Sequence, residues 1–271
     1  MRLLNAETLA FADFIDADTA PQYAILSHTW GKEEVTYSDM QTNRRLSQSK
    51  LGFKKIKYCA SQTIEDGLEY FWIDTCCIDK SSSAELSEAI NSMFKWYQKA
   101  AICYAYLFDV LEYPKRYDSP RAIELLWRKK SLRWFTRGWT LQELIAPRRL
   151  VFFSSSWVNM GTRETFALSI FNRTGIPTDV LHDPTTLFAK SVAQRMSWAS
   201  HRDTSRVEDL AYCLMGLFDV NMPMLYGESE KAFIRLQEEI IKMSDDMSIF
   251  AWTDTKANFS SFRGLLAKGL E

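Results

Sequence analysis

The sequence predicts an α/β fold in which a mainly parallel sheet with flanking helices is followed by a mostly helical half. Three observations predict it. Short apolar runs typical of buried strands alternate with amphipathic helical patterns as far as about residue 153. The connections between these runs are long enough to hold a helix, and strand signals become rare after that point. A strand, a helix and a second strand form a βαβ unit, which implies parallel pairing and a right-handed crossover.

The first βαβ unit lies near the N-terminus. Residues 23–28 are an apolar run that becomes polar at its end, and they form the first predicted strand. An amphipathic pattern over residues 51–66 predicts the helix that follows, with Gly67 as its C-terminal cap. Residues 70–74 form the second predicted strand, which carries Asp74 at its C-terminal end.

The next elements complete the predicted sheet. Ser82-x-x-Glu85 has the pattern of a capping box, which predicts a helix over the apolar periodicity that follows. Residues 100–107 are the third predicted strand, residues 136–145 a short helix, and residues 150–153 the fourth strand. Residues 112–130 lack a regular pattern and are predicted to be an irregular surface insertion.

The second half of the chain is predicted to be mostly helical. The helical patterns cover residues 162–173, 187–200, 208–214 and 228–243, and residues 248–252 read as a last strand. We divide the chain into an α/β core of residues 1–155 and a helical elaboration of residues 156–271. No low-complexity linker separates the two parts, so we expect them to pack into one continuous unit.

Composition limits the classes of function. Lysine and arginine number 33 against 34 aspartates and glutamates, so the net charge of −1 provides no overall field for nucleic acid or anionic lipid. Acidic residues follow soon after the start of the sequence, and no window approaches the roughly 18 apolar residues of a membrane span, so we expect neither a secretory leader nor a membrane span. Five cysteines at irregular spacings read as reduced thiols, and the three histidines are too far apart in sequence for a zinc site, so we expect no metal and a cytoplasmic location.

Polar side chains at the strand ends are the first candidates for a site. Ligands of parallel α/β sheets bind beyond the C-terminal ends of the strands. Ser27 and His28 end the first strand and Asp74 ends the second, and for these three a binding role and a simple turn role are evenly balanced. For Asp109, after the third strand, we favour the role of a loop cap.

The segment from residue 133 to residue 144 is the most informative for chemistry. On a helix, Trp139 and Glu143 are four residues apart and share the side opposite the apolar face. An indole beside a carboxylate, with Arg133 and Arg137 near in sequence, is typical of a pocket wall. The spacing alone does not separate this interpretation from an ordinary glutamate on a surface helix.

Two weaker candidates remain. A nucleophilic pair of Cys76 with His28 requires neighbouring strands, and a packing role for a strand cysteine is the more common one. The charged run His201-Arg202-Asp203 precedes an apolar helix. We favour a salt-bridged helix N-terminus there over an anion site between the two halves.

Three blocks of the sequence resemble a known family. Residues 23–31 (YAILSHTWG), 71–80 (FWIDTCCIDK) and 133–144 (RWFTRGWTLQEL) resemble the signature blocks of the fungal HET (heterokaryon incompatibility) domain, in the same order. Residues 196–199 and 208–212 also resemble the region that follows in such proteins. This resemblance implies an effector of programmed cell death in fungal self/non-self recognition, a form of innate immunity, and further regulatory domains on a longer chain.

A more distant resemblance suggests the chemistry. The strand and helix order, with Gly138-Trp139-x-x-x-Glu143-Leu144, resembles the TIR domain, whose Trp-Cys-x-x-Glu-Leu helix carries the glutamate needed to cleave NAD. Thr140 stands at the cysteine position. The resemblance implies a TIR-like, flavodoxin-like sheet, NAD⁺ as substrate without a further cofactor, and a homo-oligomer as the active form.

On this reading the protein is an NAD⁺ glycohydrolase. Cleavage of the nicotinamide–ribose bond develops oxocarbenium character, and nicotinamide leaves as a neutral molecule, so one carboxylate at Glu143 is sufficient. The expected substrate-binding residues are Ser27, His28, Trp30, Asp74, Arg133, Arg137 and Trp139, with an indole stacked on a ring and the polar groups on ribose or phosphate. The alternative is a non-enzymatic module that self-associates and recruits a death partner, and a cysteine hydrolase at Cys76 or Cys77 is a weaker third possibility.

Overall fold

A seven-stranded sheet organises the structure. The computed structural model describes residues 1–42, 44–111, 120–128, 132–253 and 265–270. The strands are β1 (Arg2–Asn5), β2 (Phe11–Asp13), β3 (Tyr23–His28), β4 (Tyr70–Trp72), β5 (Ile102–Tyr106), β6 (Leu150–Phe153) and β7 (Asn159–Thr162). They lie in the order β2-β1-β4-β3-β5-β6-β7.

The central four strands are parallel. β3 pairs in parallel with β4 and β5, and β5 with β6, whereas β1, β2 and β7 are antiparallel additions at the two edges. In chain order the parallel strands therefore run second, first, third, fourth. The strand order reverses between β3 and β5, and ligands of such sheets bind at that point, beyond the C-terminal strand ends.

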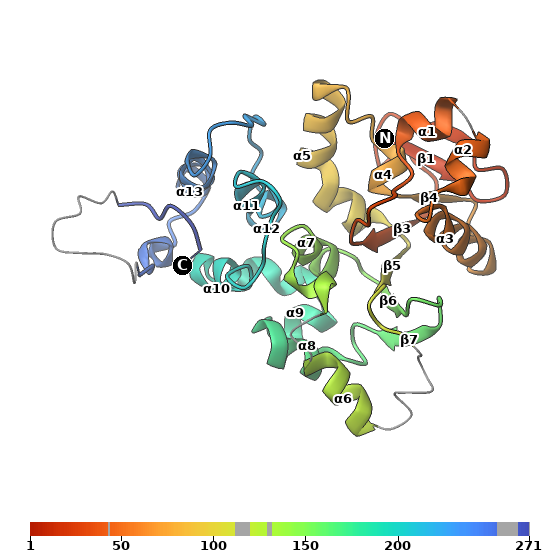
Figure 1. The fold of residues 1–271 in the computed structure, drawn as a ribbon. Coiled ribbons are helices and arrows are strands. Elements are labelled where there is room, and N and C mark those ends of the chain that lie inside the picture. Colours follow the sequence, from red (N-terminus) through yellow and green to blue (C-terminus); the bar gives the residue numbers. More distant parts are fainter. Residues whose placement is uncertain (43, 112–119, 129–131, 254–264, 271) are drawn as a thin grey trace.

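Helices cover both sides of the sheet. In the first half they are α1 (Tyr37–Thr42), α2 (Arg44–Ser49), α3 (Phe53–Glu65), α4 (Asp74–Cys77), α5 (Ser83–Lys99), α6 (Pro120–Arg128), the 3₁₀ turn η1 (Arg133–Thr136) and α7 (Thr140–Ile145). Figure 1 shows α3 on one side of the sheet and α5 and α7 on the other. This is the arrangement that right-handed crossovers produce when the strand order reverses.

The second half consists mainly of short helices. They are α8 (Ala167–Thr174), α9 (Thr178–His182), η2 (Pro184–Ala189), α10 (Val192–Ser197), α11 (Asp209–Tyr212), α12 (Met215–Phe218), α13 (Lys231–Met243) and η3 (Met247–Phe250). In Figure 1 they lie on the same side of the sheet as α5 and α7. No helix in the described part of the chain is long and apolar enough to cross a bilayer.

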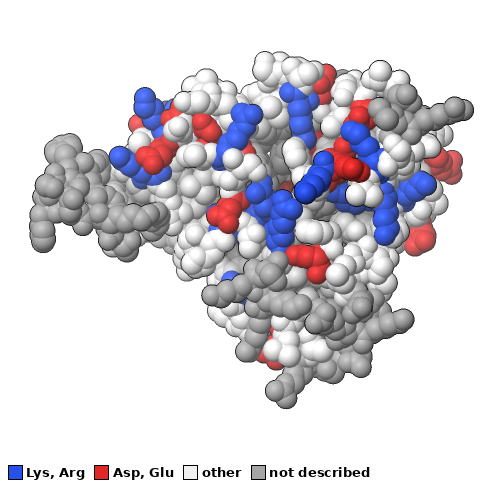
Figure 2. All heavy atoms as spheres, in the orientation of Figure 1, with Lys and Arg blue, Asp and Glu red and all other residues white. Residues whose placement is uncertain are grey.

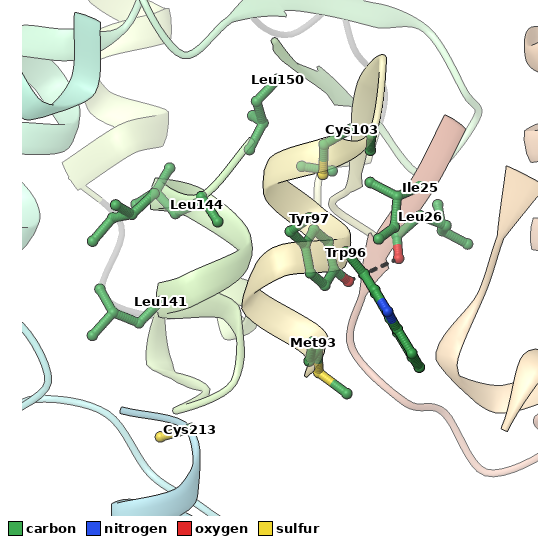
Figure 3. Packing of buried hydrophobic residues seen from close by; sticks show 14 of the residues in the cluster. Ile25, Leu26, Met93, Trp96, Tyr97, Cys103, Leu141, Leu144, Leu150 and Cys213 are labelled. Carbon is green, nitrogen blue, oxygen red and sulfur yellow. Dashed lines mark hydrogen bonds between the residues drawn. The ribbon is translucent and has the colours of Figure 1, made fainter. Parts of the chain in front are cut away.

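The core holds α7 against the sheet. Every residue of β3 and β5 is buried, as expected for parallel strands covered on both faces. Figure 3 shows Trp96 and Tyr97 of α5 between β3 and the leucines of α7, and the Tyr97 hydroxyl donates to the carbonyl of Leu26 at 3.2 Å. Leu141 and Leu144 are fully buried, so the position of α7 relative to the end of β3 is fixed by packing.

Most of the predicted elements are confirmed. β3 has the predicted bounds, and β4, β5 and β6 lie within or at the predicted strands. Ser82 caps α5 by accepting from the backbone N–H of Glu85 at 3.3 Å. The second half of the capping box does not form, because the Glu85 carboxylate instead accepts from Arg2 at 2.7 Å and from the backbone N–H of Asp79.

Three predictions are wrong. Residues 112–130 were predicted to be an irregular surface insertion, but residues 120–128 form the helix α6. Leu126 and Trp127 of this helix are buried, so they belong to the core. Residues 112–119, 129 and 130 lie outside the described residues. Residues 248–252 form no strand, because Asp246 caps the 3₁₀ turn η3. Cys76 and Cys77 lie in α4 and not in a strand.

The edge strands are additions that the sequence pattern missed. β1 separates β2 from β4, and β7 pairs with β6 beyond residue 155, so the sheet extends past the boundary drawn from the sequence. These strands contain only three or four residues each, which is too short for a recognisable alternation. The division into a core and a helical elaboration stays a prediction.

Candidate functional site

The carboxyl group of Glu143 meets the C-terminal end of β3. The hydroxyl of Ser27 donates to Glu143 Oε2 at 2.5 Å, and the indole Nε1 of Trp134 donates to Ser27 Oγ at 2.7 Å. Ser27 is completely buried, and Glu143 is only 7% exposed. The helical pattern predicts that Glu143 points away from the core, and this prediction is wrong. The side chain lies between α7 and β3, where Ser27 supplies a polar partner.

Burial changes the acidity of Glu143. Loss of hydration raises the pKa of this carboxyl group from 4.5 to about 8, and the nearby charge of Asp74 acts in the same direction. The hydrogen bond from Ser27, the hydroxyl of Tyr97 and the charge of Arg202 oppose the rise. Glu143 is therefore largely protonated at neutral pH, and a cation placed beside it would favour the ionised form.

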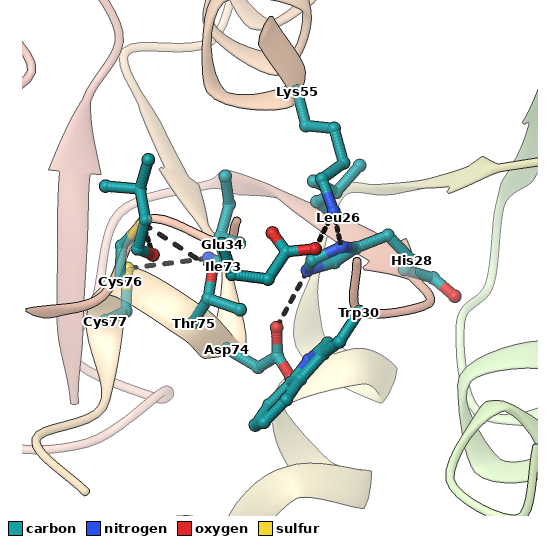
Figure 4. A network of polar contacts seen from close by, with 12 residues as sticks. Leu26, His28, Trp30, Glu34, Lys55, Ile73, Asp74, Thr75, Cys76 and Cys77 are labelled. Carbon is teal, nitrogen blue, oxygen red and sulfur yellow. Dashed lines mark hydrogen bonds and ion pairs between the residues drawn. The ribbon is translucent and has the colours of Figure 1, made fainter. Parts of the chain in front are cut away.

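A second polar network lies next to Ser27 at the same strand end. Figure 4 shows His28 between Asp74 and Lys55, with the carboxylate of Glu34 beside the end of the lysine. His28 Nε2 lies 2.9 Å from Asp74 Oδ1, and Lys55 Nζ lies 2.8 Å from His28 Nδ1. Because an ammonium group can only donate, Nδ1 is the acceptor and Nε2 donates to Asp74. Lys55 also pairs with Glu34, which fixes the lysine in place.

Asp74 orients an exposed indole. Trp30 Nε1 donates to Asp74 Oδ2 at 2.7 Å, while the Trp30 side chain is 47% exposed. The ammonium group of Lys80 lies 3.5 Å from the centre of the Trp30 ring and covers one of its faces. Burial tends to raise the pKa of Asp74, but the hydrogen bond from His28, the charge of Lys80 and the hydrogen bond from Trp30 lower it well below its ordinary value. Asp74 is therefore a fixed anion.

The structure brings together five of the predicted residues. They form two hydrogen-bonded sets at the end of β3, Ser27 with Glu143 and His28 with Asp74 and Trp30, and the two sets meet where Ser27 and His28 follow one another in the chain. They come from segments that are up to 116 positions apart in the sequence. Their common position is the reversal point of the strand order, where the topology predicts a ligand.

The other three predicted residues make different contacts. The side chain of Arg133 is exposed, and its backbone N–H donates to Asp109 at 2.7 Å. Arg137 donates to the hydroxyl of Ser205 at 2.8 Å. Trp139 is half-buried, and its indole hydrogen-bonds the carboxyl group of Asp209.

Several members of the site were missed. Trp134 takes the place beside Glu143 that the pattern gives to Trp139, because the turn η1 directs its indole to Ser27. Trp134 lies inside residues 133–144, the segment that the sequence analysis identified as the most informative for chemistry. Lys80 also ends one of the quoted blocks, residues 71–80, whereas Lys55 and Glu34 lie outside all of them. The roles of all three depend on the packing of α3 and α4 around β3.

Cysteine chemistry is not supported. All five cysteine thiols are free and buried. Burial raises the pKa of Cys76 to about 12, and its Sγ donates to the carbonyl of Val35 at 3.2 Å, so the reactive thiolate is disfavoured. No group of His, Cys, Asp or Glu side chains within the described ranges is arranged to hold a metal ion.

The surface around the site carries both signs of charge. Figure 2 shows lysine and arginine side chains across the middle of the face on which α7 and the end of β3 lie in Figure 1. Carboxylates lie between them. This mixture agrees with the net charge of −1, so local groups and not a broad field decide what binds here.

Comparison with known proteins identifies the family. The profile of the family "Heterokaryon incompatibility protein (HET)" matches residues 23–119, and that of a domain of unknown function (DUF8212) matches residues 231–268. The chain is 49% identical over 240 residues to Vegetative incompatibility protein HET-E-1 of Podospora anserina. The alignment covers 87% of this chain, but the chain spans only 17% of the length of that relative. No solved structure matches the chain. Residues 23–119 of the chain therefore form a heterokaryon incompatibility (HET) domain.

Proposed function

We propose that this chain is the cell-death effector region of a fungal incompatibility protein, and that it acts in the cytoplasm by hydrolysing NAD⁺ at the nicotinamide–ribose bond. The family and the name of the relative support the biological role. The observation that carries the chemistry is the hydrogen bond from Ser27 to Glu143, which holds a carboxyl group at the end of β3 where the strand order reverses. The distant resemblance to TIR domains points to the same residue.

The reaction needs few groups. The bond between ribose C1′ and the nicotinamide nitrogen breaks with its electron pair passing to nicotinamide, which leaves as a neutral molecule. Water then adds to C1′ and releases one proton, so the products are nicotinamide, ADP-ribose and H⁺. The positive charge of the nicotinamide ring favours ionisation of Glu143, whose carboxylate stabilises the oxocarbenium ion and accepts the proton of the attacking water.

The neighbouring groups bind and orient the substrate in this proposal. Trp30 is exposed and fixed by Asp74, so its uncovered face is available to stack on an aromatic ring. His28 is held in one orientation by Asp74 and Lys55 and lies next to Ser27. Arg133, with its exposed side chain, is suited to the diphosphate of NAD⁺.

Activation by self-association is part of the proposal. Glu143 is 7% exposed, so NAD⁺ can reach it only after the groups around it move. We propose that formation of a homo-oligomer supplies that change and that regulatory domains elsewhere on a longer chain control it. Activity should then rise with protein concentration more steeply than in direct proportion.

The test is an assay of nicotinamide release. The purified chain is incubated with NAD⁺ over a range of protein concentrations, and Glu143→Gln is compared with the wild type. We expect at least a 100-fold loss of turnover with folding and assembly retained. Glu238→Gln on α13 is the matched control, because Glu238 is exposed and belongs to the helical half. Equal turnover by wild type and Glu143→Gln would refute the catalytic role.

The burial of Glu143 favours a second candidate function. A carboxyl group hydrogen-bonded between α7 and β3 also fits a structural role in a module that only self-associates and recruits a death partner. Expression of Glu143→Gln in fungal cells separates the two. Cell death at the wild-type level, with NAD⁺ unchanged, supports the non-enzymatic module, whereas loss of both supports the hydrolase.

A further inference from the structure

A large cavity lies among helices of both halves of the chain. It has a volume of about 780 Å³ and is lined by residues of α6, η1, α8, the end of α10 and the turn that follows it. Glu143 and the strand-end residues of the candidate site do not line it. A volume of this size is within the range of about 300–1,000 Å³ found for pockets that bind small molecules.

Basic side chains dominate the charge of this cavity. Arg173, His201 and Arg202 line it, and no carboxylate does so among the described residues. His201 is exposed and lies at the rim, whereas Arg202 is only 6% exposed and forms part of the floor. Arg173 is held in the wall by donating to the backbone carbonyl of Trp127 at 2.9 Å. The cavity therefore presents the positive charges of Arg173 in its wall and Arg202 in its floor.

The guanidinium group of Arg202 makes only some of the hydrogen bonds that it could donate. Its Nη1 donates to the carbonyl of Arg137 and to the hydroxyl of Thr140, each at 2.9 Å, while its Nη2 has no hydrogen-bond partner in the described part of the chain. The salt-bridged helix N-terminus that the sequence favoured does not include this arginine. Burial lowers its pKa to about 10, so it is still charged at neutral pH. A buried guanidinium group without an anion is costly, and a ligand can supply the missing charge.

The remaining lining is mostly neutral and polar. Hydroxyl and amide groups are presented by Ser169, Asn172 and Thr174 of α8 and by Ser197 of α10. Trp198 is almost completely buried, so it supplies an apolar wall and not a stacking surface. Hydroxyl and amide side chains beside arginines match the hydroxyls and the phosphate of a sugar phosphate.

We propose that this cavity binds a phosphorylated sugar, either free or as part of a nucleotide, with the phosphate held by Arg173, His201 and Arg202. The proposal is independent of the reaction proposed for Glu143, because the two sites share no lining residue. Arg202 also contacts Thr140, the first residue of α7, so an occupied cavity would stabilise the helix that carries Glu143.

The test is calorimetric titration of the whole chain with three probes: ribose 5-phosphate, AMP and inorganic phosphate. We expect saturable binding of ribose 5-phosphate or AMP, and at least tenfold weaker binding of phosphate alone. Whichever of the two binds more tightly identifies the source of the sugar phosphate. Arg202→Gln should weaken binding at least tenfold. Arg202→Gln also removes a buried hydrogen-bonding group and can therefore affect folding. Asn172→Trp provides a second test, because Asn172 is exposed at the rim of the cavity.

Matched controls make the outcome decisive. Asn172→Trp should block the cavity and weaken binding at least tenfold, whereas Leu168→Trp, an exposed position on α8 that does not line the cavity, should leave it unchanged. Glu143→Gln should bind like the wild type. No binding of either sugar phosphate, equal binding by the two tryptophan variants, or loss of binding in Glu143→Gln would each overturn the proposal. Binding of phosphate as tightly as both sugar phosphates would overturn it as well.

Discussion

Replacing Glu143 with glutamine should make the protein more stable at alkaline pH. Burial raises the pKa of this carboxyl group from 4.5 to about 8 in the folded state. The folded chain therefore keeps a proton that the unfolded chain has lost, and the free energy of unfolding falls as pH rises between these two values. At about 1.4 kcal/mol per pH unit the loss reaches roughly 5 kcal/mol above pH 8. Glutamine copies the shape of the neutral acid and has no proton to lose.

Urea denaturation at intervals from pH 5 to pH 9 measures this effect. The stabilities of wild type and Glu143→Gln should be close in the acidic range and separate progressively, with the variant the more stable protein above pH 8. The same substitution at the exposed Glu238 controls for the loss of a carboxylate elsewhere. Parallel pH profiles of wild type and Glu143→Gln would mean that Glu143 ionises normally in the folded state, and the description of the site would be wrong.

Three further predictions concern the same region. Ser27→Ala leaves Glu143 and the indole of Trp134 without their buried partner and should cost about 2–3 kcal/mol in urea denaturation; a loss below about 0.5 kcal/mol would contradict the hydrogen bonds. Gly138→Ala places a Cβ 2.5 Å from the Thr204 methyl group and should destabilise by about 1–3 kcal/mol, with Thr204→Ser as the variant that relieves the clash and restores the melting temperature. The kcat/KM for NAD⁺ should rise with pH to a half-maximum near pH 8, because the free protein must ionise Glu143; a profile that falls with pH would exclude the carboxylate as the active form.

The strand ends were predictable because they depend on local pattern. The apolar run of β3 and its polar ending at Ser27 and His28 are visible in the sequence. Asp74 was expected to end the next strand, but β4 ends at Trp72 and Asp74 is the first residue of α4, just beyond that strand end. A parallel sheet places such endings on one edge, and the structure joins His28 to Asp74 at 2.9 Å. The general position of Glu143 near this edge follows in the same way, from the short helix between β5 and β6.

The partners of these residues were not predictable in the same way. Trp139 and Glu143 are four positions apart, but spacing along one helix does not say which other element approaches each side chain. α11 brings Asp209 to the indole of Trp139, and β3 brings Ser27 to the carboxyl group. Lys55 reaches His28 from a helix 27 positions away. Contacts of this kind are set by tertiary packing, for which the periodicity of a single segment contains no information.

The place of β1 in the sheet has a practical consequence for anyone who excises this module. The family profile begins at Tyr23, yet β1 is inserted between β2 and β4 and covers the backbone groups of β4 on that side. A fragment started at Tyr23 would expose β4 as a bare edge, which is a template for intermolecular strand addition and aggregation. A cut after residue 119 would also discard β6 and α7, and Glu143 with them. The smallest piece worth expressing is therefore set by the hydrogen-bonded neighbours of the sheet and not by the limits of sequence similarity.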